Sequence, residues 1–175
     1  MGRKLLHLLV YLLIILKEPN MPEANAVVCG CKPSWRSYYC RRNEGLTSIP
    51  QKLPTSISKL LCLEHNKISK IEDGALANLP RLGALYLNDN QITTIHCDAF
   101  AYLPCLYSLD LRNNQITTIH SDTFANLPQL QSLCLKKNKI TTIHSDTFAN
   151  LPKLRFLSLY DNQITTIPSE WAGPG

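Results

Sequence analysis

Three tripeptides bring together the residue types of hydrolytic chemistry: His96-Cys97-Asp98, His120-Ser121-Asp122 and His144-Ser145-Asp146. A nucleophile, a base and a carboxylate are the parts of a catalytic triad, which also needs an oxyanion hole and a substrate pocket at one singular place. These tripeptides instead recur because the sequence around them recurs. We therefore interpret the Asp and Ser side chains as caps of the turn that follows, and expect that the protein is not an enzyme.

Metal ions and cofactors are the next chemistry to consider. Stacking the repeated tripeptides would place three imidazoles in a column, which could bind a metal ion or respond to pH. The capping role is the stronger interpretation, so no metal site is predicted. The sequence contains no Gly-rich phosphate loop and no HExxH motif, so no cofactor and no catalytic residue are predicted either.

The elements that position these residues repeat every 24 positions. Leucine recurs at this spacing in three series, which are Leu82, Leu106, Leu130 and Leu154; Leu85, Leu109, Leu133 and Leu157; and Leu87, Leu111, Leu135 and Leu159. An asparagine series, each member followed two residues later by Ile, consists of Asn66, Asn90, Asn114, Asn138 and Asn162. The resulting pattern, L-x-x-L-x-L-x-x-N-x-I, resembles that of leucine-rich-repeat proteins.

The chemistry of the repeat predicts its fold. Leu85 and Leu87 alternate on a short strand and point inward, whereas Tyr86 and Asn88 point outward. Each repeated Asn lies where the chain leaves the strand, and its amide can bond backbone groups that would otherwise be buried without partners. A second inward row consists of Leu76, Phe100, Phe124 and Phe148.

The predicted fold class is α/β, as a leucine-rich-repeat solenoid. Its curved parallel β-sheet forms the concave face, and loops and 3₁₀ turns form the convex face. Regular helix is limited there because each convex segment contains a proline, at Pro80, Pro104, Pro128 and Pro152.

Residues 1–26 have the features of a secretory signal peptide. Arg3 and Lys4 precede an apolar run, 5–16, which is too short to span a bilayer because spanning needs about 20 residues. Ala24-Asn25-Ala26 supplies the small residues that signal peptidase accepts, so cleavage is expected after Ala26, with a retained anchor as the alternative. The protein is therefore expected to be secreted and extracellular, with no membrane insertion after cleavage.

The overall charge bears on the kind of partner. The formal net charge is +5 over 175 residues, which is mildly basic. Binding to nucleic acid by charge alone would require a larger and more concentrated positive charge. No nucleic-acid partner is therefore predicted.

Residues 27–57 precede the first repeat and carry Cys29, Cys31 and Cys40. This segment resembles the cysteine-bearing N-terminal cap of extracellular leucine-rich-repeat proteins. The resemblance implies a disulfide-bonded cap in which Cys29 pairs with Cys40. It also implies that Cys31 lacks its family partner, because Asn25 occupies the place of the first family cysteine. Metal ligation by the three cysteines is the alternative, which is rarer in secreted proteins.

The repeats occupy residues 58–175, as five copies of which the last is incomplete. The first has Ser58 where the others have Leu, with Ile57 one residue early, as expected at a junction with a cap. No cysteine-bearing C-terminal cap follows the last repeat. The final strand, 156–160, is expected to present an open edge, covered either by Trp171 or by a second copy in a weak homodimer.

Four further cysteines lie within the repeats. Cys62 and Cys134 occupy the same outward strand position three repeats apart, which corresponds to roughly 14 Å and is too far for a disulfide. Cys97 and Cys105 bracket the convex segment of one repeat and are also expected to be too far apart. Several free thiols are therefore predicted.

The outward strand positions vary between repeats while the buried positions barely change. Solvent tolerance alone is one interpretation of this variation. Two features favour a binding site: aromatic side chains on a face that needs none, and acidic residues gathered toward the N-terminal half with basic residues toward the C-terminal half. The predicted ligand-binding residues are Glu64, Tyr86, Asn88, Asp89, Tyr107, Asp110, Arg112, Lys136, Lys137, Arg155, Phe156, Tyr160 and Asp161.

The tracts 85–92 and 157–164, together with the cap, resemble the variable lymphocyte receptors of jawless vertebrates and related chordate proteins. In that family the concave residues bind protein and carbohydrate antigens. The resemblance implies a secreted recognition protein of innate or receptor-like immunity that binds microbial surface glycans or another antigen. The alternative is an extracellular-matrix or cell-adhesion module, because that class shares the scaffold.

Overall fold

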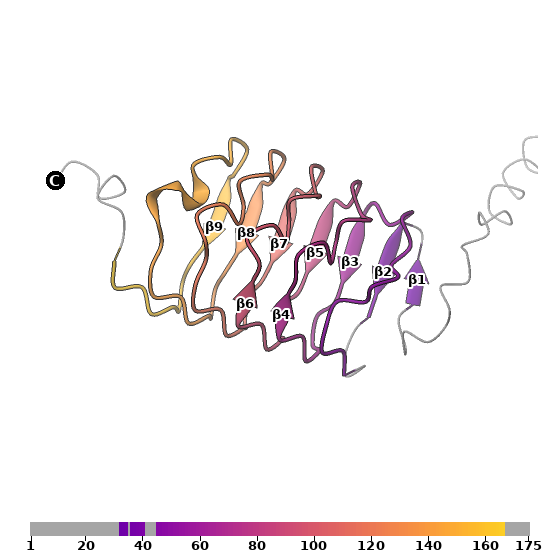
Figure 1. The fold of residues 1–175 in the computed structure, drawn as a ribbon, viewed down its shortest axis with the longest axis horizontal. Helices are drawn as coiled ribbons and strands as arrows, with labels where there is room; N and C mark the ends of the chain where they lie inside the picture. The colour runs from indigo at the N-terminus through magenta and orange to yellow at the C-terminus, as the bar shows by residue number, and fades with distance from the viewer. Residues whose placement is uncertain (1–31, 35, 41–44, 167–175) are drawn as a thin grey trace, which may run out of the picture.

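The computed structural model describes residues 32–34, 36–40 and 45–166 of the chain. The predicted signal peptide, Cys29, Cys31 and Trp171 lie outside the described residues. Within them, successive turns of chain stack side by side along one direction, and each turn adds one strand to a common sheet (Figure 1). No helix in this part of the chain is long and apolar enough to cross a membrane.

The main sheet has seven strands, in the order β1 (Lys32–Ser34), β2 (Ser37–Tyr39), β3 (Leu60–Cys62), β5 (Ala84–Tyr86), β7 (Ser108–Asp110), β8 (Ser132–Cys134) and β9 (Phe156–Ser158). β1 and β2 form an antiparallel pair, and every later neighbour is parallel. From β3 onward the register pairs residues 24 apart, so Leu61, Leu85, Leu109, Leu133 and Leu157 form one row. The predicted repeat and parallel sheet are confirmed.

A smaller sheet lies where each coil passes away from the main one. It pairs β4 (Lys70–Ile71) with β6 (Thr94–Ile95) in parallel, again with a 24-residue offset. Beyond it the convex segments are turns, and the only described helix is the 3₁₀ helix η1 (Ser145–Phe148). The convex side therefore has the short turns that its prolines predict, and the described chain is closer to a β-solenoid than to an alternating α/β fold.

The core is a row of leucines behind the sheet and a row of aromatic rings behind the convex turns. Leu85 and Leu87 are completely buried, as predicted. Phe124 stacks between Phe100 and Phe148, with centroid separations of 6.0 Å and 5.9 Å. Leu76, the first member of that row, is also buried. The predicted second inward row is confirmed.

The repeated asparagines tie each coil to the previous one, as predicted. Nδ2 of Asn114 donates to the carbonyl oxygens of Leu87 and Leu111, both at 3.0 Å, and Oδ1 accepts the N–H of Ile92 at 3.0 Å. The same contacts recur at the other members of the series, Asn66, Asn90, Asn138 and Asn162. Each asparagine therefore supplies partners to backbone groups that the stacking buries.

The predicted capping role of the repeated Asp and Ser residues is wrong. His144 occupies the N-cap of η1 and makes no side-chain capping bond, because the 3₁₀ helix begins at Ser145 and that hydroxyl already lies inside the first turn. In the earlier repeat the imidazole takes the capping role, since Nδ1 of His96 accepts the N–H of Asp98 at 3.2 Å. The carboxylates are left on the exposed side of these turns.

The N-terminal end of the core is closed by the segment before the first repeat. Tyr38, Cys40, Ile49 and Ile57 are buried there. Cys40 is not among the free thiols, and its predicted pairing with Cys29 stays a prediction because Cys29 lies outside the described residues. Three of the cysteines predicted to be unpaired, Cys97, Cys105 and Cys134, are free thiols.

Candidate functional site

The parallel register brings the outward strand residues into columns across the concave face. Cys62, Tyr86, Asp110, Cys134 and Ser158 are paired neighbours in one such column. The next column, two residues further along each strand, contains Glu64, Asn88, Arg112, Lys136 and Tyr160. The predicted residues therefore share one face, although they come from five different repeats.

Their exposure divides the predicted residues into three groups. Tyr107, Phe156 and Tyr160 are exposed by 48%, 53% and 72%, which is unusual for large hydrophobic side chains. Also exposed are Arg112, Lys137, Arg155 and Asp161, and the half-buried ones are Glu64, Tyr86, Asp89, Asp110 and Lys136. The remaining residue, Asn88, is buried with only 3% exposure.

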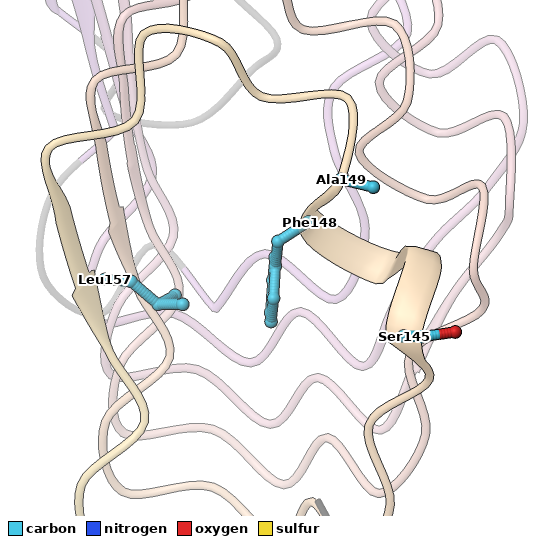
Figure 2. A pocket seen from close by; sticks show the side chains of 4 residues that line it. All are labelled: Ser145, Phe148, Ala149 and Leu157. Carbon is cyan, nitrogen blue, oxygen red and sulfur yellow. The ribbon is translucent and has the colours of Figure 1, made fainter. Parts of the chain in front are cut away.

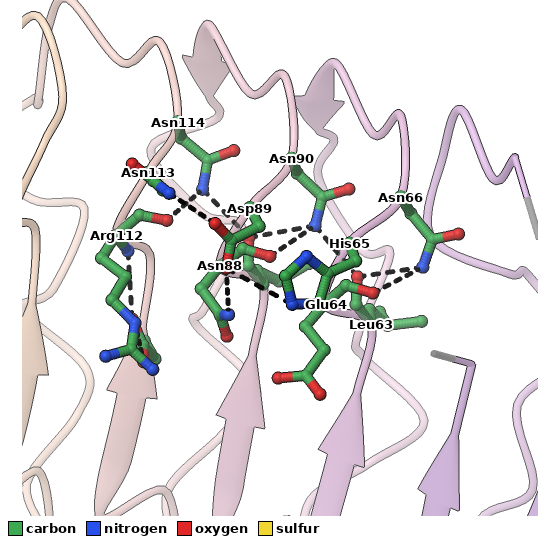
Figure 3. A network of polar contacts seen from close by, with 12 residues as sticks. Leu63, Glu64, His65, Asn66, Asn88, Asp89, Asn90, Arg112, Asn113 and Asn114 are labelled. Carbon is green, nitrogen blue, oxygen red and sulfur yellow. Dashed lines mark hydrogen bonds and ion pairs between the residues drawn. The ribbon is translucent and has the colours of Figure 1, made fainter. Parts of the chain in front are cut away.

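The prediction that Asn88 faces solvent is therefore wrong. It lies between Glu64 and Arg112 in its column, and its side chain contacts Asp89 (Figure 3). Its Nδ2 donates to Oδ2 of Asp89 at 2.6 Å, whereas its Oδ1 has no hydrogen-bond partner among the described residues. Asn88 holds the Asp89 carboxylate in place and does not offer a contact surface of its own.

Asp89 is the centre of a polar network at the edge of the concave face (Figure 3). Its carboxylate accepts hydrogen bonds from Asn88 and from Asn113 of the next repeat, and Oδ2 lies 3.7 Å from Nε2 of His65 in the previous repeat. His65, Asp89 and Asn113 occupy the same repeat position, and all three have a left-handed backbone with φ between 56° and 58°. This conformation recurs at the equivalent Lys137 and Asp161.

The environment of Asp89 favours its ionised form. Partial burial acts to raise the pKa of Asp89, but the hydrogen bonds from Asn113 and Asn88 and the charges of His65 and Arg112 outweigh it, so the pKa is lowered. Asp89 therefore carries a fixed negative charge at neutral pH.

Asp110 behaves in the opposite way. Burial raises its pKa, and the negative charges of Asp89 and Glu64 raise it further against the opposing effect of Arg112. Nε of Arg112 lies 3.1 Å from Oδ2 of Asp110, and the Arg112 N–H donates to Oδ1 at 3.1 Å. Glu64, Asp89 and Asp110 thus influence one another across three repeats, and we call them the acidic centre.

The C-terminal half of the face is basic and aromatic. Nζ of Lys136 lies 5.2 Å from the centre of the Tyr160 ring, within the range of a cation–π contact. Lys137 follows Lys136 and is exposed, and Arg155 is exposed just before the start of β9. The charge separation expected from the sequence is therefore present on one continuous sheet.

Two contributions to this surface were missed in the sequence. A Cβ atom on Gly83 would lie 2.6 Å from the Tyr107 ring, so this glycine allows the ring to pack over the backbone of the previous strand. The signal for it was available, since the equivalent positions are Tyr107, Gln131 and Arg155 and only this repeat has glycine. The second is the contact of Asp89 with Asn113, which the 24-residue offset alone makes neighbours.

Two hollows accompany the described surface. One, of about 380 Å³, lies beside the acidic centre and is lined by His65 and Asp89 among others. The other, of about 340 Å³, lies at the last described coil, where Phe148 and Leu157 point toward one another from opposite sides of the coil (Figure 2). Neither contains a nucleophile beside a base, so neither supports a catalytic role.

The solved structures that resemble this chain include one described as the crystal structure of a TLR13–ssRNA13 complex. It superposes with a TM-score of 0.71 at 32% sequence identity and covers 82% of the present chain. The present chain spans only 20% of that neighbour's length. No curated protein matches the sequence.

Comparison with family models gives three overlapping matches to the leucine-rich repeat, over residues 41–92, 59–116 and 104–164. Together they cover most of the chain and coincide with the stacked coils of the structure. The chain belongs to the leucine-rich-repeat family.

Proposed function

We propose that this protein is a secreted recognition protein of innate or receptor-like immunity, related to the variable lymphocyte receptors, which binds a microbial surface molecule or another antigen on its concave face. The observation that carries the proposal is the chemistry of that face. An acidic centre and a basic, aromatic half lie on one rigid sheet, while exposed Tyr and Phe side chains provide the area typical of binding hot spots.

The comparisons support the receptor-like part of this proposal. The TLR13 neighbour aligns over most of this chain, and its structure is a complex with single-stranded RNA. That ligand is not transferred, because the present chain corresponds to only a fifth of the neighbour. The modest net charge of +5 still favours a partner other than nucleic acid.

The two halves of the face suit different groups of one ligand. Asp89 and Asp110, held by Asn113 and Arg112, suit an amine or guanidinium group. Lys136, Lys137 and Arg155 suit phosphate, sulfate or carboxylate groups, and Tyr160 offers a flat apolar surface beside them. A microbial glycan or protein that carries both charges would fit this arrangement.

Secretion and the disulfide-bonded cap complete the proposal. The apolar run 5–16 and the small residues before Val27 support export, and an oxidising compartment would allow Cys29 to pair with Cys40. Mass spectrometry of the mature protein, before and after reduction, tests both points. A mature N-terminus at Val27 and a peptide linking Cys29 to Cys40 are expected.

The central experiment measures binding of the recombinant protein to whole bacteria, heparin, collagen and a single-stranded RNA oligonucleotide. We expect binding to bacteria, which Asp89→Ala/Asp110→Ala or Lys136→Ala/Lys137→Ala weakens at least tenfold. Matched controls remove the same charges elsewhere, with Asp122→Ala/Asp146→Ala for the acidic pair and Arg81→Ala/Lys153→Ala for the basic pair, since these side chains are exposed outside the concave face. Unchanged binding in both concave variants would remove the site from this face.

The choice of ligand separates the immune role from the matrix-module alternative. Tight binding to heparin or collagen without binding to bacteria would support an adhesion module. Tight binding to RNA alone would instead overturn the expectation drawn from the net charge. Either result would reject the proposed microbial ligand, even if the concave variants abolished the binding that is observed.

A further inference from the structure

The turn after β6 brings three different metal-ligating side chains together, at a place separate from the concave face. His96, Cys97 and Asp98 are consecutive, and their ligand atoms all lie within 4.8 Å of one another. His96 and Asp98 are exposed and Cys97 is half-buried, so an ion could reach them from solvent. No other group of three such residues is this close in the part of the chain that the structure describes.

The backbone of this turn is fixed on both sides. The N–H of His96 donates to the carbonyl oxygen of Ile71 at 2.9 Å, and the N–H of Ala99 donates to that of His96 at 3.1 Å. Ile95 and Ala99, which flank the three residues, are both buried. The three side chains therefore start from a backbone whose position the core determines.

Two of the three distances between the donor atoms are close to those of a tetrahedral zinc site, and the third is within 4.8 Å. Sγ of Cys97 lies 3.8 Å from Nδ1 of His96 and 3.5 Å from Oδ2 of Asp98. With a Zn–S bond of about 2.3 Å and Zn–N and Zn–O bonds of about 2.1 Å, neighbouring ligands of a tetrahedron are about 3.6 Å apart. To surround one ion, His96 Nδ1 must exchange the N–H of Asp98, which donates to it at 3.2 Å, for the metal.

We propose that His96, Cys97 and Asp98 bind a zinc ion or another borderline divalent cation. A thiolate, an imidazole and a carboxylate form a donor set that suits Zn²⁺ and Co²⁺ better than Ca²⁺ or Mg²⁺, which prefer oxygen alone. The Cys97 thiol loses its proton to solvent when the metal–sulfur bond forms. Three protein ligands leave a fourth position of the tetrahedron for a water molecule.

The repeat supplies the comparison that isolates Cys97. The equivalent tripeptides are His120-Ser121-Asp122 and His144-Ser145-Asp146, which keep the imidazole and the carboxylate but have a hydroxyl in place of the thiol. Cys97→Ser therefore gives this turn the tripeptide sequence that two other repeats of the chain already have. Ser121→Cys makes the reverse change and creates a second copy of the donor set.

The test is titration of the reduced protein with Co²⁺. Binding is monitored by the thiolate-to-cobalt charge-transfer absorption, and competition with Zn²⁺ gives the affinities. In Cys97→Ser we expect the absorption to fall by the amount that one equivalent of bound Co²⁺ contributes. We also expect Zn²⁺ to bind at least tenfold more weakly. Ser121→Cys should add one equivalent. His96→Ala should reproduce the loss while leaving the thiol in place, which distinguishes a chelate from a lone cysteine.

Equal absorption and equal Zn²⁺ affinity in the wild type and Cys97→Ser would overturn the proposal, because any binding would then belong to other cysteines. Loss in Cys97→Ser but not in His96→Ala would also overturn it, since the imidazole would have no part. Circular dichroism of each variant before titration shows whether the fold is intact. The proposal is independent of what the concave face binds.

Discussion

Asn114 and Leu87 are 27 residues apart in sequence, yet Nδ2 of Asn114 donates to the Leu87 carbonyl oxygen at 3.0 Å. The contact crosses from one coil to the previous one. Asn90 and Leu63 make the same contact at 2.9 Å, and Asn138 and Leu111 at 3.0 Å. This ladder holds the coils in register, and so it also fixes the columns of the concave face.

Replacing Asn114 with Ala should destabilise the protein by about 3 kcal/mol or more, because buried carbonyl groups and the Ile92 N–H lose their partners together. Urea denaturation measures the change. Asn162→Ala should cost less, since Asn162 is only partly buried and its amide reaches two carbonyl groups, whereas that of Asn114 also reaches the Arg112 carbonyl oxygen at 3.2 Å. The neighbouring control Gln115→Ala removes a solvent-exposed hydrogen bond from Lys139 and should change stability by less than about 0.5 kcal/mol.

Those features of the fold that depend on the repeat could be predicted from the sequence. The 24-residue leucine spacing predicts the strand register, the phenylalanine row and the asparagine ladder, because one repeat dictates the geometry of the next. The acidic centre was predicted as a set of neighbours for the same reason. What the spacing does not encode is how side chains of different length cover one another.

Two errors and one omission concern local detail that the repeat spacing does not encode. Asn88 was expected to face solvent, but it is buried and its amide donates to the Asp89 carboxylate. The capping role was given to Asp and Ser, whereas the turn begins one residue earlier than the pattern suggests and His96 takes that role. The packing of Tyr107 over Gly83 depends on one missing Cβ atom, which a leucine pattern does not report.

Lys137 has a left-handed backbone, with φ at 55°, which costs an L-residue with a long side chain about 1 kcal/mol or more. Asn tolerates this conformation, and the previous repeat has Asn113 at the same position. Lys137→Asn should therefore stabilise the protein by about 0.5–1 kcal/mol. Thermal unfolding measures the gain, and Lys139→Asn serves as the control, because Lys139 does not have a positive φ. An equal gain in both variants would show that charge, not backbone strain, is the cause.

Thr123 has a buried hydroxyl with no hydrogen-bond partner among the described residues, and so does the equivalent Thr147. The two earlier repeats have Ala75 and Ala99 at that position, which shows that the site does not need a hydroxyl. Thr123→Val keeps the shape and removes the unsatisfied group, so it should stabilise the protein by about 1 kcal/mol. Ala99→Thr should have the opposite effect. Denaturant midpoints of the two variants check the pair, and destabilisation by Thr123→Val would indicate a bound water at the hydroxyl.

Asp89→Asn tests the network at the acidic centre through pH. The folded-state pKa of Asp89 lies below its ordinary value of 3.8, so its stabilising contribution is present above that value and is lost as pH falls through the folded pKa. At pH 7 the variant should be less stable by about 1–2 kcal/mol, since an amide cannot accept from both Asn88 and Asn113 as the carboxylate does.

The difference between wild type and Asp89→Asn should then shrink at acid pH, because protonation removes the same charge from the wild-type protein. Asp110 has a raised pKa, partly because of the Asp89 charge, so Asp89→Asn also changes the Asp110 contribution, which has the opposite sign. Repeating the comparison in an Asp110→Asn background separates the two contributions. Urea denaturation at pH values from 7 down to below 3.8 gives the curve. A difference that stays constant over this range would mean that Asp89 acts through shape alone, and that the charge of the acidic centre does not depend on its network.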